Sequence, residues 1–344
     1  MQTINYFGIS LIIGILSACS IPSEKATSFR SDISGPTPWS YEPSGRSSDQ
    51  FTIALVSDLN GGERDGIFSV AMEQVRLLRP DFIVTIGDLI DGGTEDVTVL
   101  KKQFDDFDAR AQKSEVPLFH VGGNHDLTNP VMRKYWEERY GRRYYHFVYK
   151  NVLFLIVDSE DFEETRMQEI YHARAEAIKI LDGEHPDEYL KTEYYRMNER
   201  KTGEISDEQS AYFEKVIAAN PEVRWTMVFM HKPVWMREEG RNFSRIEKAL
   251  STRPHTVING HLHSYSYQVR NQHDYIMLGT TGGSQRPNDN NAFDHITLVS
   301  FMENEPSIAT LRMDGIFNKE GKIPGDTVGY CYQASLCDKE VKSH

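Results

Sequence analysis

Residues 51–62, FTIALVSDLNGG, join an apolar segment to a short polar turn. The segment at residues 51–56 is β-rich and almost free of polar side chains, which predicts a buried strand. Asp58 and Asn60 follow it directly. Side chains two residues apart on extended backbone lie on the same face, so both are expected to face one ligand. An Asx turn that closes the strand explains the same pattern equally well. The choice between a ligand site and a turn depends on motifs elsewhere in the chain.

Five further apolar runs predict strands, and four of them are followed by polar motifs that contain Gly or His. The runs lie at residues 81–86, 116–121, 152–157, 225–230 and 256–258. The residues that follow are GDLID at 87–91, GGNHD at 122–126, HKP at 231–233 and NGHLH at 259–263. In open α/β sheets the carboxyl ends of the strands meet at one edge, where ligands bind. Asp, Asn and His from five strand ends are therefore expected together, and these residue types bind hard or borderline divalent metals.

Helical patterns between the strands place the chain in the α/β class. Residues 66–78 and 207–219 have apolar positions three and four apart. Ser206 and Gln209 form the sequence signature of a capping box at the start of the second helix. Alternating strands and helices predict an α/β domain. Apolar runs at residues 275–278, 295–301 and 308–313 lack clear helices between them and predict a second, more antiparallel sheet.

The bulk composition is that of a globular protein with a substantial core. The chain has 344 residues, of which 39% are hydrophobic, enough for one large domain or two medium ones. Its formal net charge of -13 disfavours nonspecific nucleic-acid binding, which a positive surface usually drives. We therefore expect no nucleic-acid partner.

The first 50 residues are predicted to lie outside the fold. Residues 7–18, FGISLIIGILSA, form an apolar run too short to span a bilayer comfortably, and Cys19 follows. The sequence LSAC at 16–19 resembles the lipobox of bacterial lipoproteins, although no Lys or Arg precedes the apolar run. This resemblance implies a signal peptide at 1–18, a lipidated Cys19 and peripheral membrane attachment in the bacterial cell envelope, either in the periplasm or on the outer surface. An ordinary signal peptide with an incidental cysteine is the alternative.

Residues 19–50 after the signal peptide are rich in Ser, Pro and Gly and are expected to form a flexible tether. Two cysteines remain near the other end of the chain, Cys331 and Cys337, in a C-terminal tail at residues 315–344. An even pair outside the cytoplasm favours a disulfide, with two free thiols as the alternative.

The order of the motifs resembles that of the calcineurin-like metallophosphoesterase superfamily. The motifs are D-x-N at 58–60, G-D-x-x-D at 87–91, G-N-H-D at 123–126, His231, and G-H-x-H at 260–263. The resemblance implies a four-layer α/β/β/α sandwich, formed as a single domain over residues 51–314. It also implies a centre of two divalent metal ions, Mn, Fe, Zn or Mg, at the strand ends.

The resemblance also implies a role for each residue of the motifs. Asp88 would bridge both metals, while the remaining ligands would be Asp58, Asn60 and His263 for the first metal and Asn124, His231 and His261 for the second. Asn60 stands where most of the family has His. A carboxamide oxygen binds transition metals more weakly than imidazole does, but it suits Mn, Mg or Ca.

His125 and Asp91 are the predicted catalytic residues outside the ligand set. In the family the corresponding histidine protonates the leaving oxygen or stabilises charge on it. Asp91 would orient His125 by accepting a hydrogen bond from the other ring nitrogen, which would raise the imidazolium population. Asp91 also stands where purple acid phosphatases carry their iron-binding Tyr, so we expect no such chromophore.

Two other segments leave alternatives open. Residues 160–203 predict a charged helical insertion that is either a substrate-selecting cap or a solvated decoration, and long charged helices favour the second. The sequence TTGG at 280–283, followed by Arg286, predicts either a phosphate contact through backbone amides and the guanidinium, or a plain glycine-rich turn.

Two classes of function fit these features. The first is a hydrolase that uses metal-activated water to cleave a small-molecule or envelope phosphoester, with monoesters and diesters equally compatible. The alternative is a surface-anchored binding protein of the same fold in which Asn60 marks a degraded first metal site. The retention of Asp88, Asn124, His125 and the later histidines favours the hydrolase. No sequence feature determines the oligomeric state.

Overall fold

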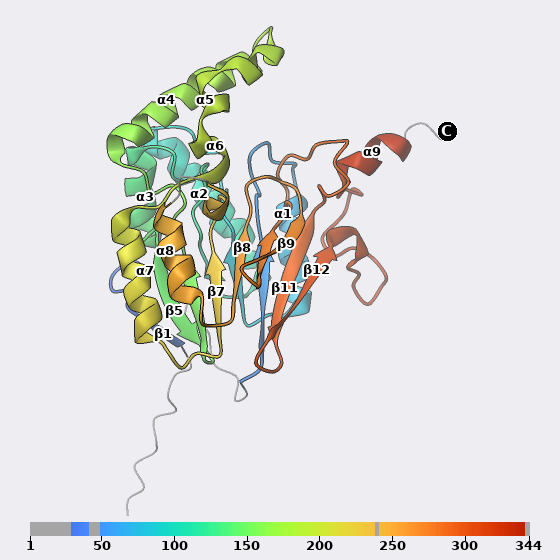
Figure 1. The fold of residues 1–344 in the computed structure, drawn as a ribbon. Coiled ribbons are helices and arrows are strands. Elements are labelled where there is room, and N and C mark those ends of the chain that lie inside the picture. Colours follow the sequence, from blue (N-terminus) through green and yellow to red (C-terminus); the bar gives the residue numbers. More distant parts are fainter. Residues whose placement is uncertain (1–28, 41–48, 238–240, 341–344) are drawn as a thin grey trace, which may run out of the picture.

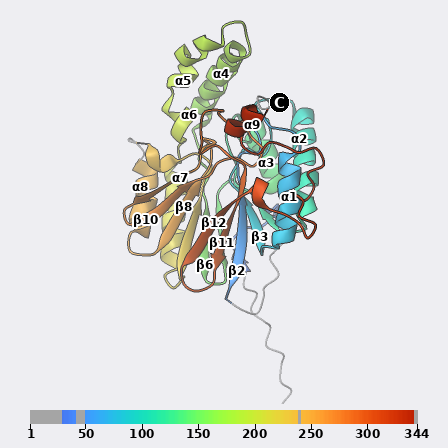
Figure 2. The same ribbon diagram turned by 90° about the vertical axis from the view of Figure 1, so that its right-hand side faces the viewer.

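The computed structural model describes residues 29–40, 49–237 and 241–340 and shows two β-sheets with helices on both outer sides (Figures 1 and 2). The predicted signal peptide and Cys19 lie outside the described residues. Within the described part of the chain, no helix is long and apolar enough to cross a bilayer.

The first sheet has five strands in the order β12-β11-β2-β3-β4. Their bounds are β2 (Phe51–Val56), β3 (Phe82–Thr85), β4 (Leu118–Phe119), β11 (His295–Phe301) and β12 (Pro306–Arg312). β2, β3 and β4 run parallel, while β11 pairs antiparallel with both β2 and β12. The two late strands therefore complete the sheet that begins at residue 51.

The second sheet has seven strands in the order β1-β5-β6-β7-β8-β10-β9. Their bounds are β1 (Phe29–Ser31), β5 (Tyr145–Tyr149), β6 (Val152–Ile156), β7 (Trp225–Phe229), β8 (His255–Asn259), β9 (Ser266–Arg270) and β10 (His273–Met277). β10 lies parallel to β8, so the prediction that the late strands form a separate antiparallel sheet is wrong. The local sequence pattern of a strand does not specify its partner, and here the late strands are divided between two mixed sheets.

Three hydrophobic clusters separate four layers of secondary structure. The helices are α1 (Ile67–Leu78), α2 (Val97–Ala111) and α3 (Pro130–Tyr140) on the five-stranded sheet, and α7 (Asp207–Ala219) and α8 (Arg241–Leu250) on the seven-stranded sheet. Between the sheets, the aromatic rings of Phe119 and Phe147 stack with centroids 4.3 Å apart. The predicted α/β/β/α sandwich is therefore confirmed, because helices cover the outer face of each sheet.

Residues 29–40 belong to the domain and not to a tether. Phe29 pairs with Tyr149 through the β1–β5 ladder, and both Phe29 and Trp39 are buried. The Trp39 ring lies 5.6 Å from that of Phe119. The prediction of a tether across residues 19–50 is wrong for this part, because two aromatic side chains in a polar segment are enough to fix it to the core.

The N-terminus of α7 forms only half of the predicted capping box. The Ser206 hydroxyl accepts a hydrogen bond from the Gln209 amide at 3.1 Å, as predicted. The Gln209 side chain instead donates to the carbonyl of Asp158 at 3.0 Å and to Asp161 at 2.9 Å. The Asp161 carboxylate accepts the hydrogen bond from the Ser206 amide at 3.1 Å. A buried tertiary contact has therefore replaced the reciprocal local bond.

The insertion forms a helical arm that rises from one end of the sandwich (Figure 1). It consists of α4 (Glu164–Leu181), α5 (Glu193–Arg196), α6 (Asn198–Thr202) and a 3-10 turn, η2 (Pro186–Lys191). The arm has a small apolar cluster of its own, composed of Phe162, Met167, Ile170, Ala177, Tyr194 and Met197. A buried ion pair fixes the base of the arm, because the Lys232 ammonium lies 2.8 Å from the Glu160 carboxylate and also donates to the Glu199 carbonyl at 2.9 Å.

Lys232→Met is expected to lower the free energy of unfolding by about 3–5 kcal/mol, since it leaves the buried Glu160 carboxylate without its charged partner. Burial raises the pKa of Glu160, whereas Lys232 lowers it, so protonation of Glu160 at low pH should reduce the loss. Denaturant unfolding of Lys232→Met and of Lys232→Met/Glu160→Gln measures both effects. A loss below about 1 kcal/mol, typical of exposed ion pairs, would contradict the structural role of this pair.

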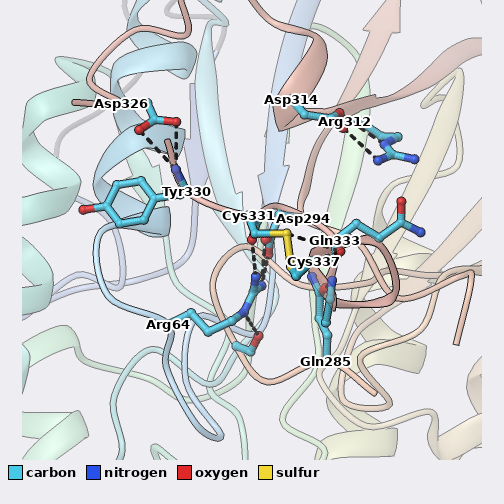
Figure 3. The surroundings of a disulfide bond; sticks show 12 residues. Arg64, Gln285, Asp294, Arg312, Asp314, Asp326, Tyr330, Cys331, Gln333 and Cys337 are labelled. Carbon is cyan, nitrogen blue, oxygen red and sulfur yellow. Dashed lines mark hydrogen bonds and ion pairs between the residues drawn. A yellow bond between two sulfur atoms is a disulfide. The ribbon is translucent and has the colours of Figure 1, made fainter. Parts of the chain in front are cut away.

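The C-terminal segment packs against the domain beyond residue 314. It contains a 3-10 helix after β12, η4 (Met313–Gly315), and a short helix, α9 (Ala334–Glu340). A disulfide joins Cys331 to Cys337, with the Cα atoms 6.0 Å apart (Figure 3). Arg64 donates to the Cys331 carbonyl at 3.0 Å, and Tyr332 is buried. The tail is therefore a packed part of the domain.

Candidate metal centre

The predicted ligand residues lie together at the carboxyl ends of β2, β3, β4, β7 and β8. Two groups of residues could each hold a metal ion, and within each group the ligand atoms lie within 4.8 Å of one another. One group is Asp88, His231 and His261, and the other is Asp58, Asp88 and His263. Asp88 is the member that both groups share. This position is the one that a carboxylate bridging two cations requires.

Tight turns, and not extended backbone, bring the ligands together. Asp58, Asp88, His261 and His263 all have left-handed backbone conformations, with φ of 51°, 56°, 79° and 55°. Such conformations cost of order 1–3 kcal/mol each for residues other than glycine and cluster at functional sites. The prediction that Asp58 and Asn60 share a face of an extended segment was therefore based on the wrong backbone geometry, although Asp58 does reach the site.

Backbone carbonyls orient the three histidines. Each ring donates one N–H to a carbonyl oxygen and leaves its other nitrogen directed at the carboxylates or the neighbouring ring. The hydrogen bonds join His231 Nδ1 to Ile86 at 2.7 Å, His263 Nδ1 to Ser284 at 2.6 Å, and His261 Nε2 to Arg200 at 2.6 Å. This arrangement fixes the tautomer of a metal-binding imidazole. The Arg200 carbonyl belongs to α6, so the insertion helps to orient a ligand.

Buried carboxylates make the site strongly attractive to cations. Burial alone would lower the pKa of His231, but the Asp88 carboxylate raises it to about 10. Burial likewise disfavours the charged form of Asp88, yet His231 and His125 hold the pKa of this carboxyl well below its usual range. His231 Nε2 lies 3.2 Å from Asp88 Oδ2. A metal that binds Asp88 and His231 would compete with protons for both groups, so we expect metal affinity to fall at low pH.

The two carboxamides differ in their hydrogen bonds. Asn124 Oδ1 lies 3.2 Å from His231 Nε2, beside the second group. The Asn60 amide donates from Nδ2 to the Leu89 carbonyl at 2.8 Å. Its Oδ1 is buried and accepts no hydrogen bond from any residue that the structure describes. An orphaned buried oxygen is costly unless it has a partner, and a cation in the first group would provide one. The residues present therefore fit a metal here.

His125 lines a cavity together with Asp88, but its Nδ1 hydrogen bond goes to the backbone of Asp91 and not to the Asp91 carboxylate. His125 Nδ1 donates to the backbone carbonyl of Asp91 at 2.7 Å, while the Asp91 side chain lines a separate cavity of about 360 Å³. The prediction that the Asp91 carboxylate orients His125 is therefore wrong. The pKa of His125 is lowered, because burial and the Arg174 charge outweigh the opposite effect of Asp88. The expected increase in the imidazolium population is therefore not found.

Asp126, which the sequence left without a role, joins two of the site loops. Its carboxylate accepts hydrogen bonds from the Gly123 amide at 2.8 Å, the Leu89 amide at 2.9 Å and the Ile90 amide at 3.3 Å. The loops after β3 and β4 therefore hold each other in place. The position of Asp126 at the end of the G-N-H-D motif is the sequence signal that could have indicated this role.

The insertion lines the cavity above the site. The cavity has a volume of about 550 Å³, and its walls include Asp88, Asn124, His125 and His261 together with Arg174, Ile178, Leu181, Tyr189, Tyr194 and Arg200 of the insertion. The interpretation of residues 160–203 as a purely solvated decoration is therefore wrong. A charged helix can carry one inward face, and the average composition of the segment hides that face.

The backbone amides of the glycine-rich turn are already used within the fold. Thr281 donates to the Ser57 carbonyl at 2.7 Å, Gly282 to the Asp294 carboxylate at 3.0 Å, and Gly283 to the Asp58 carbonyl at 2.8 Å. The prediction that these amides bind a phosphate is therefore wrong. Arg286, the other half of that prediction, does line the cavity.

Comparison with known proteins agrees with this geometry. The family model described as calcineurin-like phosphoesterase matches residues 51–265, so the chain belongs to this family and is a phosphoesterase enzyme. A search of curated proteins finds no significant match.

Two solved structures show the same fold. A dimetal phosphatase from Danio rerio has 16% sequence identity and a TM-score of 0.51, with 76% of this chain and 99% of that chain covered. A purple acid phosphatase from yellow lupin (Lupinus luteus) seeds has 13% identity and a TM-score of 0.50, with 79% of this chain and 52% of that chain covered. At these identities the likeness concerns the fold alone.

Asn60→Ala is expected to weaken the first metal and spare the second, because the second group does not use this side chain. Asn60→His should tighten binding of Zn or Fe at the first site, since imidazole is the stronger ligand for these ions. Activity need not rise, because a longer side chain in a fitted pocket displaces its neighbours, and misplacement by about 1 Å can cost a hundredfold in rate. Competition with a chelator measures the two affinities. Wild-type affinity at both sites in both variants would leave Asn60 as no more than a turn residue.

Proposed function

We propose that the protein is a metal-dependent phosphoric ester hydrolase with a dinuclear metal centre. The observation that carries this proposal is the position of Asp88, which belongs to both groups of ligand atoms. One group alone would be sufficient for a single cation. A shared carboxylate between two groups is the arrangement that places two cations side by side.

The residues of this chain have separate parts in the reaction. Asp58, Asn60 and His263 would hold one cation, Asn124, His231 and His261 the other, and Asp88 both. When bound, the cations supply Lewis-acid polarisation of the phosphoryl group and activation of water. His125 would stabilise the leaving oxygen, since it lines the same cavity and its Nδ1 bond to the Asp91 carbonyl fixes the ring. The orphaned Asn60 oxygen favours Mn or Mg over Zn or Fe at the first site.

The alternative, a binding protein with a degraded first metal site, has less support. Asp58, Asp88 and His263 retain ligand atoms within 4.8 Å of one another, which a decayed site would not need to preserve. His263 Nε2 lies 3.2 Å from Asp58 Oδ1. The substitution of His by Asn at position 60 has therefore changed one ligand and left the others in place.

The experiment that tests the function compares hydrolysis of a generic phosphomonoester and a phosphodiester after chelation and separate addition of Mn, Mg, Zn, Ca and Fe. We expect chelation to abolish hydrolysis and one or more of these metals to restore it. Hydrolysis that persists in the presence of chelator would contradict a metal-dependent mechanism. Binding of phosphoesters without turnover under every condition would favour the binding protein.

We also propose that the enzyme acts outside the bacterial cytoplasm, at the cell envelope, with Cys19 as a lipid anchor. The apolar run at residues 7–18 and the small residues before Cys19 support the anchor. The Cys331–Cys337 disulfide suits an oxidising compartment. A small-molecule or envelope phosphoester is the proposed substrate, and the net charge of -13 speaks against nucleic acid as a partner.

Cys19→Ser is expected to release the protein from the membrane fraction, since stable attachment depends on the acyl chains. Fractionation followed by mass spectrometry of the mature N-terminus measures both location and modification. Cleavage at another residue, or an unmodified Cys19 in the membrane-bound wild type, would rule out the lipid anchor and favour an ordinary signal peptide.

A further inference from the structure

We propose that Arg174 of the insertion binds the phosphoryl oxygens of the substrate beside the metal centre, an inference that rests on the proposed hydrolase function. Arg174 lies on α4, and its side chain lines the cavity that Asp88, Asn124 and His125 also line. The residue is only 8% exposed. The position of an almost fully buried guanidinium beside the two groups of metal ligands therefore has to be explained.

The Arg174 side chain reaches the predicted catalytic histidine. Its Nη2 atom lies 3.2 Å from His125 Nε2, and since a guanidinium can only donate, His125 accepts. Arg174 is therefore directly beside the predicted catalytic histidine. Within the part of the chain that the structure describes, the guanidinium makes no other hydrogen bond, so its remaining N–H groups are available to a planar or tetrahedral anion.

Among the described residues Arg174 has no carboxylate partner, whereas several other arginines that are at least partly buried have one. Those arginines form ion pairs, as in Arg64 with Asp294, Arg139 with Asp108 and Arg143 with Asp158. Arg174 forms no ion pair with any carboxylate among residues 29–40, 49–237 and 241–340. Burial of an unpaired cation is costly, so the site is suited to an anion that enters with the substrate.

The face of α4 that carries Arg174 also indicates the kind of ester. Ile178 and Leu181 follow at spacings of four and seven residues, which places all three side chains on one helix face, and all three line the cavity. Exposure increases from Arg174 at 8% to Leu181 at 46%, from the site outwards. In a bound phosphoester, the guanidinium would therefore contact the phosphoryl group, while the apolar side chains would contact the alcohol portion. A phosphoester with an apolar or aromatic alcohol fits this order.

The test is calorimetric titration of inorganic phosphate into the Mn²⁺-loaded protein, together with kcat/KM for benzyl phosphate. We expect Arg174→Gln to weaken phosphate binding at least about tenfold and to lower kcat/KM about a hundredfold, the usual effect of removing one donor that stabilises a developing charge. Arg174→Lys should give intermediate values, because it keeps the charge without the bidentate fork. Lys179→Gln is the matched control on the same helix, since Lys179 is 71% exposed and should change neither value.

Wild-type phosphate affinity and kcat/KM in folded Arg174→Gln would overturn the inference. If Arg174→Gln does not fold, Arg174→Lys decides, and wild-type values there would overturn it equally. Failure of the hydrolase proposal has a different signature. In that case the wild type hydrolyses no ester under any metal condition, but phosphate binding still weakens in the Arg174 variants.

Discussion

Asp88→Asn is expected to lower kcat/KM for phosphoester hydrolysis about a thousandfold or more, the upper range for loss of one preorganised electrostatic group. Asp88 is 2% exposed and is the one residue common to both groups of ligand atoms found in the described chain. A neutral amide cannot offer two anionic oxygens, so both cations lose their shared ligand. The metal content should fall from two ions per chain to one or none.

Elemental analysis and steady-state kinetics of the same preparation check this expectation. Asp187→Asn is a matched control, because Asp187 is exposed on η2 and lies outside the ligand set. The control should retain wild-type metal content and rate. Full activity with unchanged metal content in Asp88→Asn would show that Asp88 bridges nothing.

Gly123→Ala is expected to lower activity about a hundredfold and to weaken metal binding. A Cβ atom at Gly123 would lie 2.3 Å from Asp88 Oδ1 and 2.5 Å from the Asp88 amide nitrogen. The loops around Asp88 are fixed by Asp126, so the carboxylate itself has to move, and a shift of about 1 Å is enough for this loss. Overpacking of this kind also costs about 1–3 kcal/mol of stability.

Gly315→Ala is the control for Gly123→Ala, because a Cβ there meets no described atom within 4 Å. This control should change stability by less than about 0.5 kcal/mol and leave the rate unchanged. Wild-type metal affinity and rate in Gly123→Ala would mean that the loop can move away from Asp88 without cost. The close approach of the two loops would then have no functional meaning.

The sequence predicts the frame of the site well, because apolar strands and the polar residues after them are local features. The strand at residues 51–56 was predicted with its exact bounds, and Asp58, Asp88, His231, His261 and His263 meet as the strand ends suggested. The physical reason is that parallel strands align their carboxyl ends whatever the details of the loops. The family resemblance then supplied the pairing of ligands, which spacing alone does not contain.

The errors concern contacts between segments that lie far apart in the sequence. Phe29 and Trp39 reach the core from a segment whose average composition is that of a tether. Asp91 offers its backbone carbonyl, and not its carboxylate, to His125, which lies 34 residues further along the chain. Arg174 has no motif that marks it, and its position in the cavity wall depends on how α4 packs over the site. Tertiary packing decided each of these cases.

The measurement that tests the dinuclear hydrolase most directly starts from protein made metal-free with a chelator and titrates it with Mn²⁺. At each step both the rate of phosphoester hydrolysis and the amount of bound metal per chain are measured. The account predicts that two ions bind per chain and that activity appears only as the second site fills, since Asp88 joins both groups. Full activity after one equivalent, or activity that does not depend on added metal, would contradict it.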